Sequence, residues 1–201
     1  MNSLINTMNN RKLIVASASP RRHQLIAGLD IPFSVEKSAH PDENYDHAID
    51  INSVPLHLAK MKSFYFGREL KEDEILLTAD TLVICENEIL EKPASREDAL
   101  EMLGKLSGKA HTVITGVHLR SLKGERGFSA STVVYFKTLS RQEIDYYLDN
   151  YKPYDKAGAY GVQEWIGYIA IEKIEGSYFN VMGLPVQKLY NELQVFIDLG
   201  Y

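Results

Sequence analysis

The sequence of 201 residues has a single cysteine, Cys85, and no long hydrophobic run. One cysteine excludes an internal disulfide and fits a reducing compartment. No apolar stretch approaches the roughly 18 residues that a membrane-spanning helix requires. The apolar stretch Leu13–Ala16 is also far shorter than the ~7–15 residues of the central region of a signal peptide. These absences predict a cytoplasmic protein that does not enter a membrane.

Positive charge is also scarce, since the net charge is −5 with histidine neutral. A protein that coats DNA or RNA needs a basic face, so this balance argues against a nucleic acid polymer as partner. A small phosphorylated ligand is still compatible, because a few lysines and arginines can converge on one cleft of an acidic protein. The sequence therefore leaves small-molecule chemistry open while excluding a general nucleic-acid surface.

The apolar pattern predicts one α/β domain over residues 12–201, which can form two lobes, after a disordered or frayed extension at residues 1–11. Apolar Lys12–Ala16 followed by a Ser-Ala-Ser-Pro turn predicts a strand, a tight loop and a helix with Ser19 as its N-cap. The order of βα units and one hairpin predicts a mixed, twisted sheet flanked by helices. Further strands are predicted at 75–79, 82–85, 111–120, 127–137 and 168–174, with helices after Ser53, Ser95 and Ser140 and at the C-terminal end.

The turn Ser17-Ala18-Ser19-Pro20-Arg21-Arg22 is the first candidate site. Free N–H groups at a helix N-terminus bind anions, and two hydroxyls and two guanidiniums add donors suited to phosphate oxygens. A capping serine followed by surface arginines explains the same pattern, and spacing alone favours this simpler interpretation slightly.

Asp80 is the second candidate, because it follows the predicted strand 75–79 directly. Open α/β sheets bind ligands at the carboxyl ends of their strands, where a carboxylate can hold Mg²⁺ or activate water. The ordinary alternative is a turn aspartate that bonds its own backbone.

Three further charged residues, Glu43, Lys62 and Lys92, are weak candidates when taken one at a time. Lys62 points away from the apolar stripe of its predicted helix, which usually means a solvated face. The histidines lack the spacing of a zinc site, and Cys85 fits a small core residue better than a nucleophile.

Several motifs, taken together, resemble the Maf family of nucleotide pyrophosphatases. The resemblance covers nearly the whole chain after residue 12, and the joint occurrence of the motifs is far more specific than any one of them. The matching segments are LIVASASPRRHQLIAGL, LAKMKS, TADTLV, ILEKP, LSGKAHTVITGV, DKAGAYGVQ and GSYFNVMGLPVQKL.

The resemblance implies a fold similar to that of the inosine-triphosphate pyrophosphatase group, with a deep cleft. It also implies attack of water on the α-phosphorus of a nucleoside triphosphate, with a divalent metal cation, Mg²⁺ or Mn²⁺, present. On this basis Asp80 matches the proton acceptor, and Glu43 is the second carboxylate that supports the metal. The residues implied to grip the triphosphate are Ser17, Ser19, Arg21, Lys62 and Lys92.

Three positions resemble the branch of the family that acts on dTTP and UTP rather than the branch that acts on 7-methyl-GTP. They are Arg22, Thr81 and Gln163. A glutamine amide can pair with the O4 and N3–H edge of uracil or thymine, and an arginine can donate to a carbonyl.

Two function classes stay open. The first is a dTTP and UTP pyrophosphatase, and the second is a non-catalytic nucleotide-binding regulator of cell division, since Maf-like proteins are also associated with septum inhibition. The retained carboxylates and lysines favour catalysis. The family also suggests a homodimer.

Overall fold

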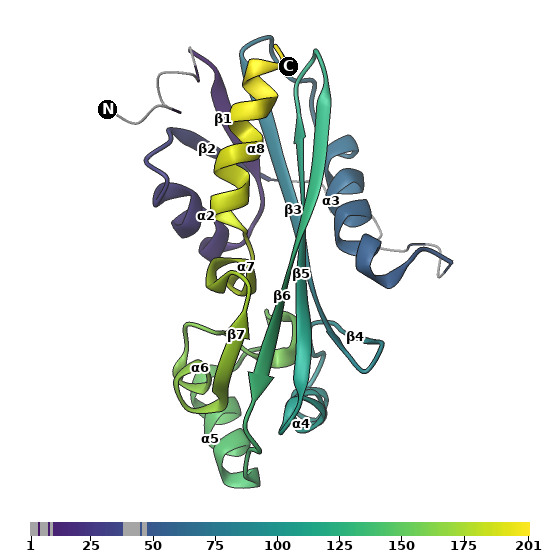
Figure 1. Ribbon diagram of the computed structural model, residues 1–201, viewed down its shortest axis with the longest axis vertical. Coiled ribbons are helices and arrows are strands. Elements are labelled where there is room, and N and C mark those ends of the chain that lie inside the picture. Colours follow the sequence, from purple (N-terminus) through teal and green to yellow (C-terminus); the bar gives the residue numbers. More distant parts are fainter. Residues whose placement is uncertain (1–3, 5–7, 9, 38–44, 46–47) are drawn as a thin grey trace. The chain divides into compact units, whose positions relative to one another are not determined.

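The structure is a computed structural model that describes residues 4, 8, 10–37, 45 and 48–201. Within these residues the strands form a seven-stranded sheet in the order β2-β1-β3-β5-β6-β7, and β4 pairs with β3 (Figure 1). Parallel and antiparallel neighbours occur in the same sheet, and helices flank it. The predicted mixed α/β sheet is therefore confirmed.

Strands and helices are interspersed along the chain, and β3–β4 and β5–β6 are consecutive strands. The strands are β1 (Lys12–Ala16), β2 (Phe33–Glu36), β3 (Glu74–Cys85), β4 (Glu88–Leu90), β5 (Ala110–Arg120), β6 (Glu125–Phe136) and β7 (Ile171–Glu175). The helices are α2 (Pro20–Ala27), α3 (Val54–Phe64), α4 (Arg96–Leu106), α5 (Arg141–Tyr151), α6 (Trp165–Ala170), α7 (Tyr178–Met182) and α8 (Val186–Asp198). Two short 3₁₀ turns cover Ile51–Ser53 and Ala157–Ala159.

The contacts divide the chain into two compact units. Unit one comprises residues 1–80, 115–130 and 183–201, and unit two comprises residues 81–114 and 131–182. Strands β3, β5 and β6 contribute residues to both. Within the described part of the chain, no helix is long and apolar enough to cross a membrane.

In unit one, β1 lies parallel to both β2 and β3. Residues 13–16 of β1 are all buried, as expected for a parallel strand that is covered on both faces. Helix α3 begins against β5 at Gly116, where an added Cβ would lie 2.2 Å from the backbone nitrogen of Leu56. Only glycine allows this approach, which fixes α3 on one face of the strands, while α8 lies on the other side (Figure 1).

Leu4 and Met8, which fall in the predicted extension, are buried.

Unit two contains an aromatic cluster around a buried histidine. The rings of His111, Phe136 and Tyr160 meet edge to face with centroid separations of 4.9 to 5.3 Å. His111 Nε2 also lies 2.8 Å from the hydroxyl of Tyr160. Edge-to-face packing of this kind adds to the ordinary gain from burial. The cluster fixes the segment around Tyr160 on β5 and β6.

Local sequence signals placed several elements correctly. The helix predicted after Ser140 begins with a capping box, in which the serine hydroxyl and the Glu143 carboxylate each accept from a backbone N–H of the other residue. Ser95 caps α4 by accepting from the N–H of Asp98. Glu86 and Asn87 both have positive φ, as a two-residue hairpin turn between β3 and β4 requires.

Two local predictions are wrong. Strand β3 does not break at Asp80 and Thr81 but runs from Glu74 to Cys85; it pairs with β1 through residues 74–77 and with β4 through residues 83–85, and β5 is a further neighbour. The predicted strand at 168–174 is instead the helix α6 followed by β7 at Ile171–Glu175. Ser19 occupies the predicted N-cap position of α2, although its side chain makes no capping bond.

Candidate functional site

The turn between β1 and α2 is built around Ser17, which is buried. Its hydroxyl accepts a hydrogen bond from the N–H of Ser19 at 3.2 Å, and its carbonyl oxygen lies 2.7 Å from Nε2 of His23. The turn therefore holds its shape through side-chain bonds while α2 begins at Pro20. This is the strand-to-helix arrangement in which N–H groups and the helix dipole favour an anion.

Arg22 connects this turn to Ala79 of β3 and to Gly183, all in unit one. Its Nε donates to the carbonyl of Gly183 at 2.9 Å, and its Nη1 donates to the carbonyl of Ala79 at 2.9 Å. Nη1 also lies 3.4 Å from the hydroxyl of Ser17. Because one guanidinium bridges α2, β3 and the start of the last segment, it fixes the spacing between the Ser17 turn and the residue before Asp80.

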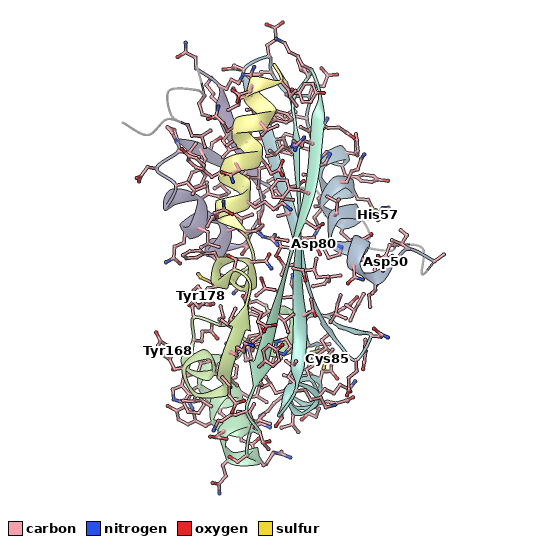
Figure 2. The ribbon with its side chains drawn as sticks, in the orientation of Figure 1. Asp50, His57, Asp80, Cys85, Tyr168 and Tyr178 are labelled. Atoms are coloured by element: carbon pink, nitrogen blue, oxygen red, sulfur yellow. The ribbon has the colours of Figure 1, made fainter. Side chains whose placement is uncertain are left out.

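Asp80 and Lys62 form an ion pair in unit one. Lys62 Nζ lies 2.6 Å from Asp80 Oδ1, and the two side chains are only 14% and 11% exposed. Asp80 stands about midway along β3 (Figure 2). The helix that carries Lys62 is fixed to the same strand, because the hydroxyl of Thr78 donates to the carbonyl of Ala59 at 2.7 Å. The sequence placed Lys62 on a solvated face, and the structure corrects this.

A cavity of about 520 Å³ opens beside these residues, within the range of small-molecule sites. It brings together the predicted residues Ser17, Arg22 and Lys62. Its lining is Ala16, Ser17, Ala18, Arg22, His23, Val35, Glu36, Lys37, Lys62 and Ala79. Arg21 and Ser19 belong to the same turn and are partly exposed.

His23, Glu36 and Lys37 also line the cavity, and the sequence reasoning missed them. Glu36 and Lys37 stand at the carboxyl end of β2, which runs parallel to β1. No strand was predicted at Phe33–Glu36, so the rule that ligands bind at the carboxyl ends of parallel strands could not be applied there.

Glu36 is held by Arg68. The guanidinium donates to both carboxylate oxygens of Glu36, at 3.0 and 2.6 Å, and also binds both oxygens of Glu74. The bond from Arg68 keeps the pKa of Glu74 below its usual range, despite the burial of that carboxyl group. Glu36 therefore lines the cavity as a carboxylate that is already engaged by a cation.

The other predicted residues belong to unit two. Thr81 is half-buried in β3, and Lys92 is exposed just after β4. Gln163 is half-buried, and its Oε1 atom is buried without a hydrogen-bond partner among the described residues. A buried acceptor that lacks a donor is costly unless a ligand or water supplies one.

Glu43 and Asp80 are the two carboxylates predicted to hold a metal ion. Glu43, the predicted second metal carboxylate, lies outside the described residues. Among the residues that are described, no group of three or more histidines, cysteines and acids could hold a metal ion. Asp80 is the predicted metal-binding carboxylate in the described part of the chain.

A mixed sheet with a strand-to-helix turn after its first strand, and an aspartate–lysine pair close to the cavity at that turn, defines an α/β protein with the arrangement that favours a phosphorylated small molecule. The family model described as "Maf-like protein" matches residues 12–196. The chain therefore belongs to the Maf-like family, as its motifs predicted.

Individual relatives cover almost the full length of the chain. A protein of Porphyromonas gingivalis named "dTTP/UTP pyrophosphatase" is 51% identical over 197 residues, which cover 96% of this chain and 98% of that protein. Proteins of the same name from Parabacteroides distasonis and Bacteroides thetaiotaomicron are 49% and 44% identical, and the matches cover 96% and 95% of this chain and 100% and 99% of theirs.

Proposed function

We propose that the protein hydrolyses dTTP and UTP to the monophosphate and pyrophosphate. The observation that carries this proposal is the partly buried Lys62–Asp80 pair beside the cavity at the Ser17 turn. Family membership and the shared name of several full-length relatives support the same reaction. A carboxylate base and a cation held within hydrogen-bonding distance are two groups that favour attack of water on the α-phosphorus and cleavage of the α–β phosphoanhydride bond.

Asp80 acts as the proton acceptor in this proposal. Its side chain is largely shielded from solvent, and its bond to Lys62 keeps it oriented before the nucleotide arrives. A carboxylate held in this way can take a proton from the attacking water as the water approaches the α-phosphorus.

Lys62 has two roles that follow each other. Without nucleotide it neutralises Asp80, and with nucleotide bound its ammonium group can turn its other N–H donors to phosphate oxygens. The departing pyrophosphate gains negative charge, so a cation that is already in place lowers the barrier. The N–H groups at the start of α2 and the hydroxyls of Ser17 and Ser19 add donors for the same phosphates. Arg21 and Lys92 complete the proposed phosphate-binding set.

A divalent metal cation, Mg²⁺ or Mn²⁺, fits the chemistry of these donors. Mg²⁺ is commonly bound through one or two carboxylates, substrate phosphates and water, rather than by an all-protein cage. Asp80 offers the carboxylate, with Glu43 proposed as the second. Such an ion would withdraw charge from the phosphate oxygens when bound. The ammonium of Lys62 would then be released from Asp80 to the nucleotide.

Gln163 is proposed to recognise the base. Its Oε1 atom is a buried acceptor without a partner in the described structure, so it is suited to receive an N–H donor. Uracil and thymine carry a donor at N3, whereas cytosine carries an acceptor there. Thr81, which the family resemblance places with Gln163, is proposed to take part in the same substrate recognition. Arg22 is also part of this proposed set, although in the structure its guanidinium is engaged by two backbone carbonyls.

We also propose a cytoplasmic protein that acts on free nucleotides as a homodimer. The free, buried thiol of Cys85 supports a reducing compartment, and the net charge of −5 argues against nucleic acid polymers. Sedimentation analysis of the purified protein would test the dimer, which a monomer at all concentrations would contradict.

The decisive experiment is a nucleotide panel with product identification. Purified protein is incubated with dTTP, UTP, CTP and 7-methyl-GTP in the presence of Mg²⁺ or Mn²⁺. We expect dTTP and UTP to be hydrolysed fastest, with one pyrophosphate released per monophosphate. A clear preference for 7-methyl-GTP would reject the proposed substrates. Release of inorganic phosphate with a nucleoside diphosphate would reject the proposed reaction.

A further inference from the structure

A buried polar network in unit two holds the segment that carries Gln163. The hydroxyl of Tyr147 accepts a hydrogen bond from the N–H of Gly161 at 3.1 Å and donates one to Oε2 of Glu164. The other oxygen of Glu164 pairs with Nζ of Lys156 at 3.0 Å. We refer to these four residues as the Tyr147 network. Both carboxylate oxygens of Glu164 are thus occupied, one residue after Gln163.

The absence of a side chain at Gly161 brings the Gln163 amide against this network. An added Cβ at Gly161 would lie 2.8 Å from Cδ of Glu164 and 3.0 Å from Nε2 of Gln163. The carboxylate and the amide therefore both pack against the same glycine. Because packed interiors leave little free space, a shift of the carboxylate must also move the amide.

The Tyr147 hydroxyl is well suited to hold Gly161 and Glu164 in one geometry. Tyr147 is fully buried, and the partners of its hydroxyl, one acceptor and one donor, both lie within unit two. Burial, together with the bond to Glu164, raises the pKa of the phenol, which keeps the donor proton in place. A buried network with its groups satisfied favours one geometry over its alternatives.

We propose that the Tyr147 network is a positioning device that sets the orientation of the Gln163 amide and thereby the preference for uracil and thymine over cytosine. This inference rests on the proposed function. The amide oxygen must point at the N3–H donor of the base, and a rotation that brings the amide nitrogen there removes the discrimination. The network residues do not need to touch the nucleotide, since they act through Gln163.

Two substitutions test this role with little change in volume. Tyr147→Phe removes only the hydroxyl, so the Gly161 N–H and one oxygen of Glu164 lose their shared partner. Gly161→Ala adds one methyl group next to two side-chain ends that can give way, so it moves the amide without a clash against backbone.

Each variant has a matched control in the same unit. Tyr135→Phe removes an exposed hydroxyl that donates to Glu175 at 2.9 Å. Gly104→Ala adds a methyl group in α4, where no described atom lies within 4 Å of the new carbon.

The measured quantity is kcat/KM for dTTP divided by kcat/KM for CTP, with a thermal melt for each protein. We expect Tyr147→Phe and Gly161→Ala to lower this ratio about tenfold, the effect of one misplaced hydrogen bond, while both controls keep the wild-type ratio. Equal losses for both nucleotides would indicate a purely structural role and overturn the inference. If Tyr147→Phe does not fold, the ratio in Gly161→Ala decides.

The wild-type protein separates this inference from the proposed function. A wild-type enzyme that prefers dTTP, together with an unchanged ratio in a folded variant, overturns the inference alone. A wild-type protein that does not hydrolyse dTTP to pyrophosphate overturns the proposed function and the inference with it.

Discussion

The two units hold their candidate residues by different means. In unit one the charged groups are held by opposite charges or backbone carbonyls, as in the Lys62–Asp80 pair and the bonds from Arg22. In unit two the segment of Gln163 is held by the fully buried Tyr147 and by close packing at Gly161. Charge pairs can exchange partners when a charged ligand arrives, whereas a packed network keeps its shape. Changes to the Lys62–Asp80 pair should therefore cost rate, and changes to the Tyr147 network should cost selectivity.

Asp80→Asn is expected to have the largest effect. The amide keeps the size of the carboxylate but cannot accept a proton, so kcat for dTTP should fall by about 10³-fold, in the middle of the range for general base catalysis. Nucleotide binding should survive, because a negative charge near the triphosphate has been removed. Single-turnover release of pyrophosphate and calorimetric binding of dTTP would measure the two effects.

The matched control for Asp80→Asn is Glu125→Gln. Glu125 forms an ion pair with Lys60, which is on α3 like Lys62. The N–O distance is 2.6 Å, as in the Lys62–Asp80 pair, but the side chain of Glu125 is 39% exposed. We expect this control to retain wild-type kcat. Turnover by Asp80→Asn at the level of the control would remove Asp80 from the chemistry.

Lys62→Met should have the next largest effect. Methionine preserves much of the aliphatic stem but removes the ammonium, so one preorganised cation is lost from the phosphates. Loss of one such donor costs about 10²-fold in kcat/KM. The control is Lys60→Met, two residues earlier in α3, whose partner Glu125 lies in the exposed pair. Equal activity of the two variants in steady-state kinetics would contradict a role for Lys62.

Much of the fold could be predicted from local sequence. The helix start after Ser140 and the long strands β5 and β6 each depend on neighbouring residues, and each was predicted. The break predicted at Asp80 failed because β3 continues from Glu74 to Cys85 with β5 as a neighbour, while β1 and β4 pair with its two ends. Strand partners lie far away in the chain, so no local pattern reports them.

The candidate site was predictable to a similar extent. Motif resemblance singled out Ser17, Lys62 and Asp80, and the structure adds that Lys62 pairs with Asp80. The helical position of Lys62 suggested solvent, because periodicity gives the face of a helix but not what packs against that face. The Tyr147 network joins residues 14 to 17 positions apart through bonds that no spacing rule encodes.

Each unit contains one buried histidine that makes the free energy of unfolding depend on pH. His111 in unit two and His118 in unit one are almost inaccessible, and burial lowers the pKa of each to about 4. In the unfolded chain each histidine takes up a proton near pH 6.5, whereas in the folded protein it stays neutral until the pH approaches 4. The free energy of unfolding is therefore unaffected by these histidines above pH 6.5, and it falls by about 2–3 kcal/mol for each histidine as the pH falls towards 4.

Urea unfolding at several pH values would measure this loss. His118→Leu and His111→Leu should each flatten the decline of the free energy of unfolding between pH 6.5 and 4, with the other histidine intact in each case. Burial alone lowers the pKa of His111, whereas at His118 the effect of burial is joined by opposing charges, with Glu125 raising the pKa and Lys60 and Arg120 lowering it. Because both pKa values fall to about 4, the two variants should flatten the curve by similar amounts. An unchanged slope in both variants would show that burial of these rings is not what makes the protein sensitive to acid.

Gly116→Ala tests how strongly the stability and activity of unit one depend on the close packing of α3 against β5. The new methyl group would meet the backbone of Pro55 and Leu56, which cannot rotate away as a side chain can, so the start of α3 must move. Overpacking of this kind costs about 2 kcal/mol of folding free energy. Because Lys62 is on the same helix, kcat/KM for dTTP should fall by a few fold as well. Gly127→Ala is the graded control, since its methyl group would meet side-chain atoms alone, the end of Leu56 at 3.0 Å and Cδ2 of His118 at 3.6 Å. Chemical unfolding and steady-state kinetics of both proteins give the comparison. If Gly116→Ala loses stability but keeps full kcat/KM, the position of Lys62 does not depend on how α3 begins.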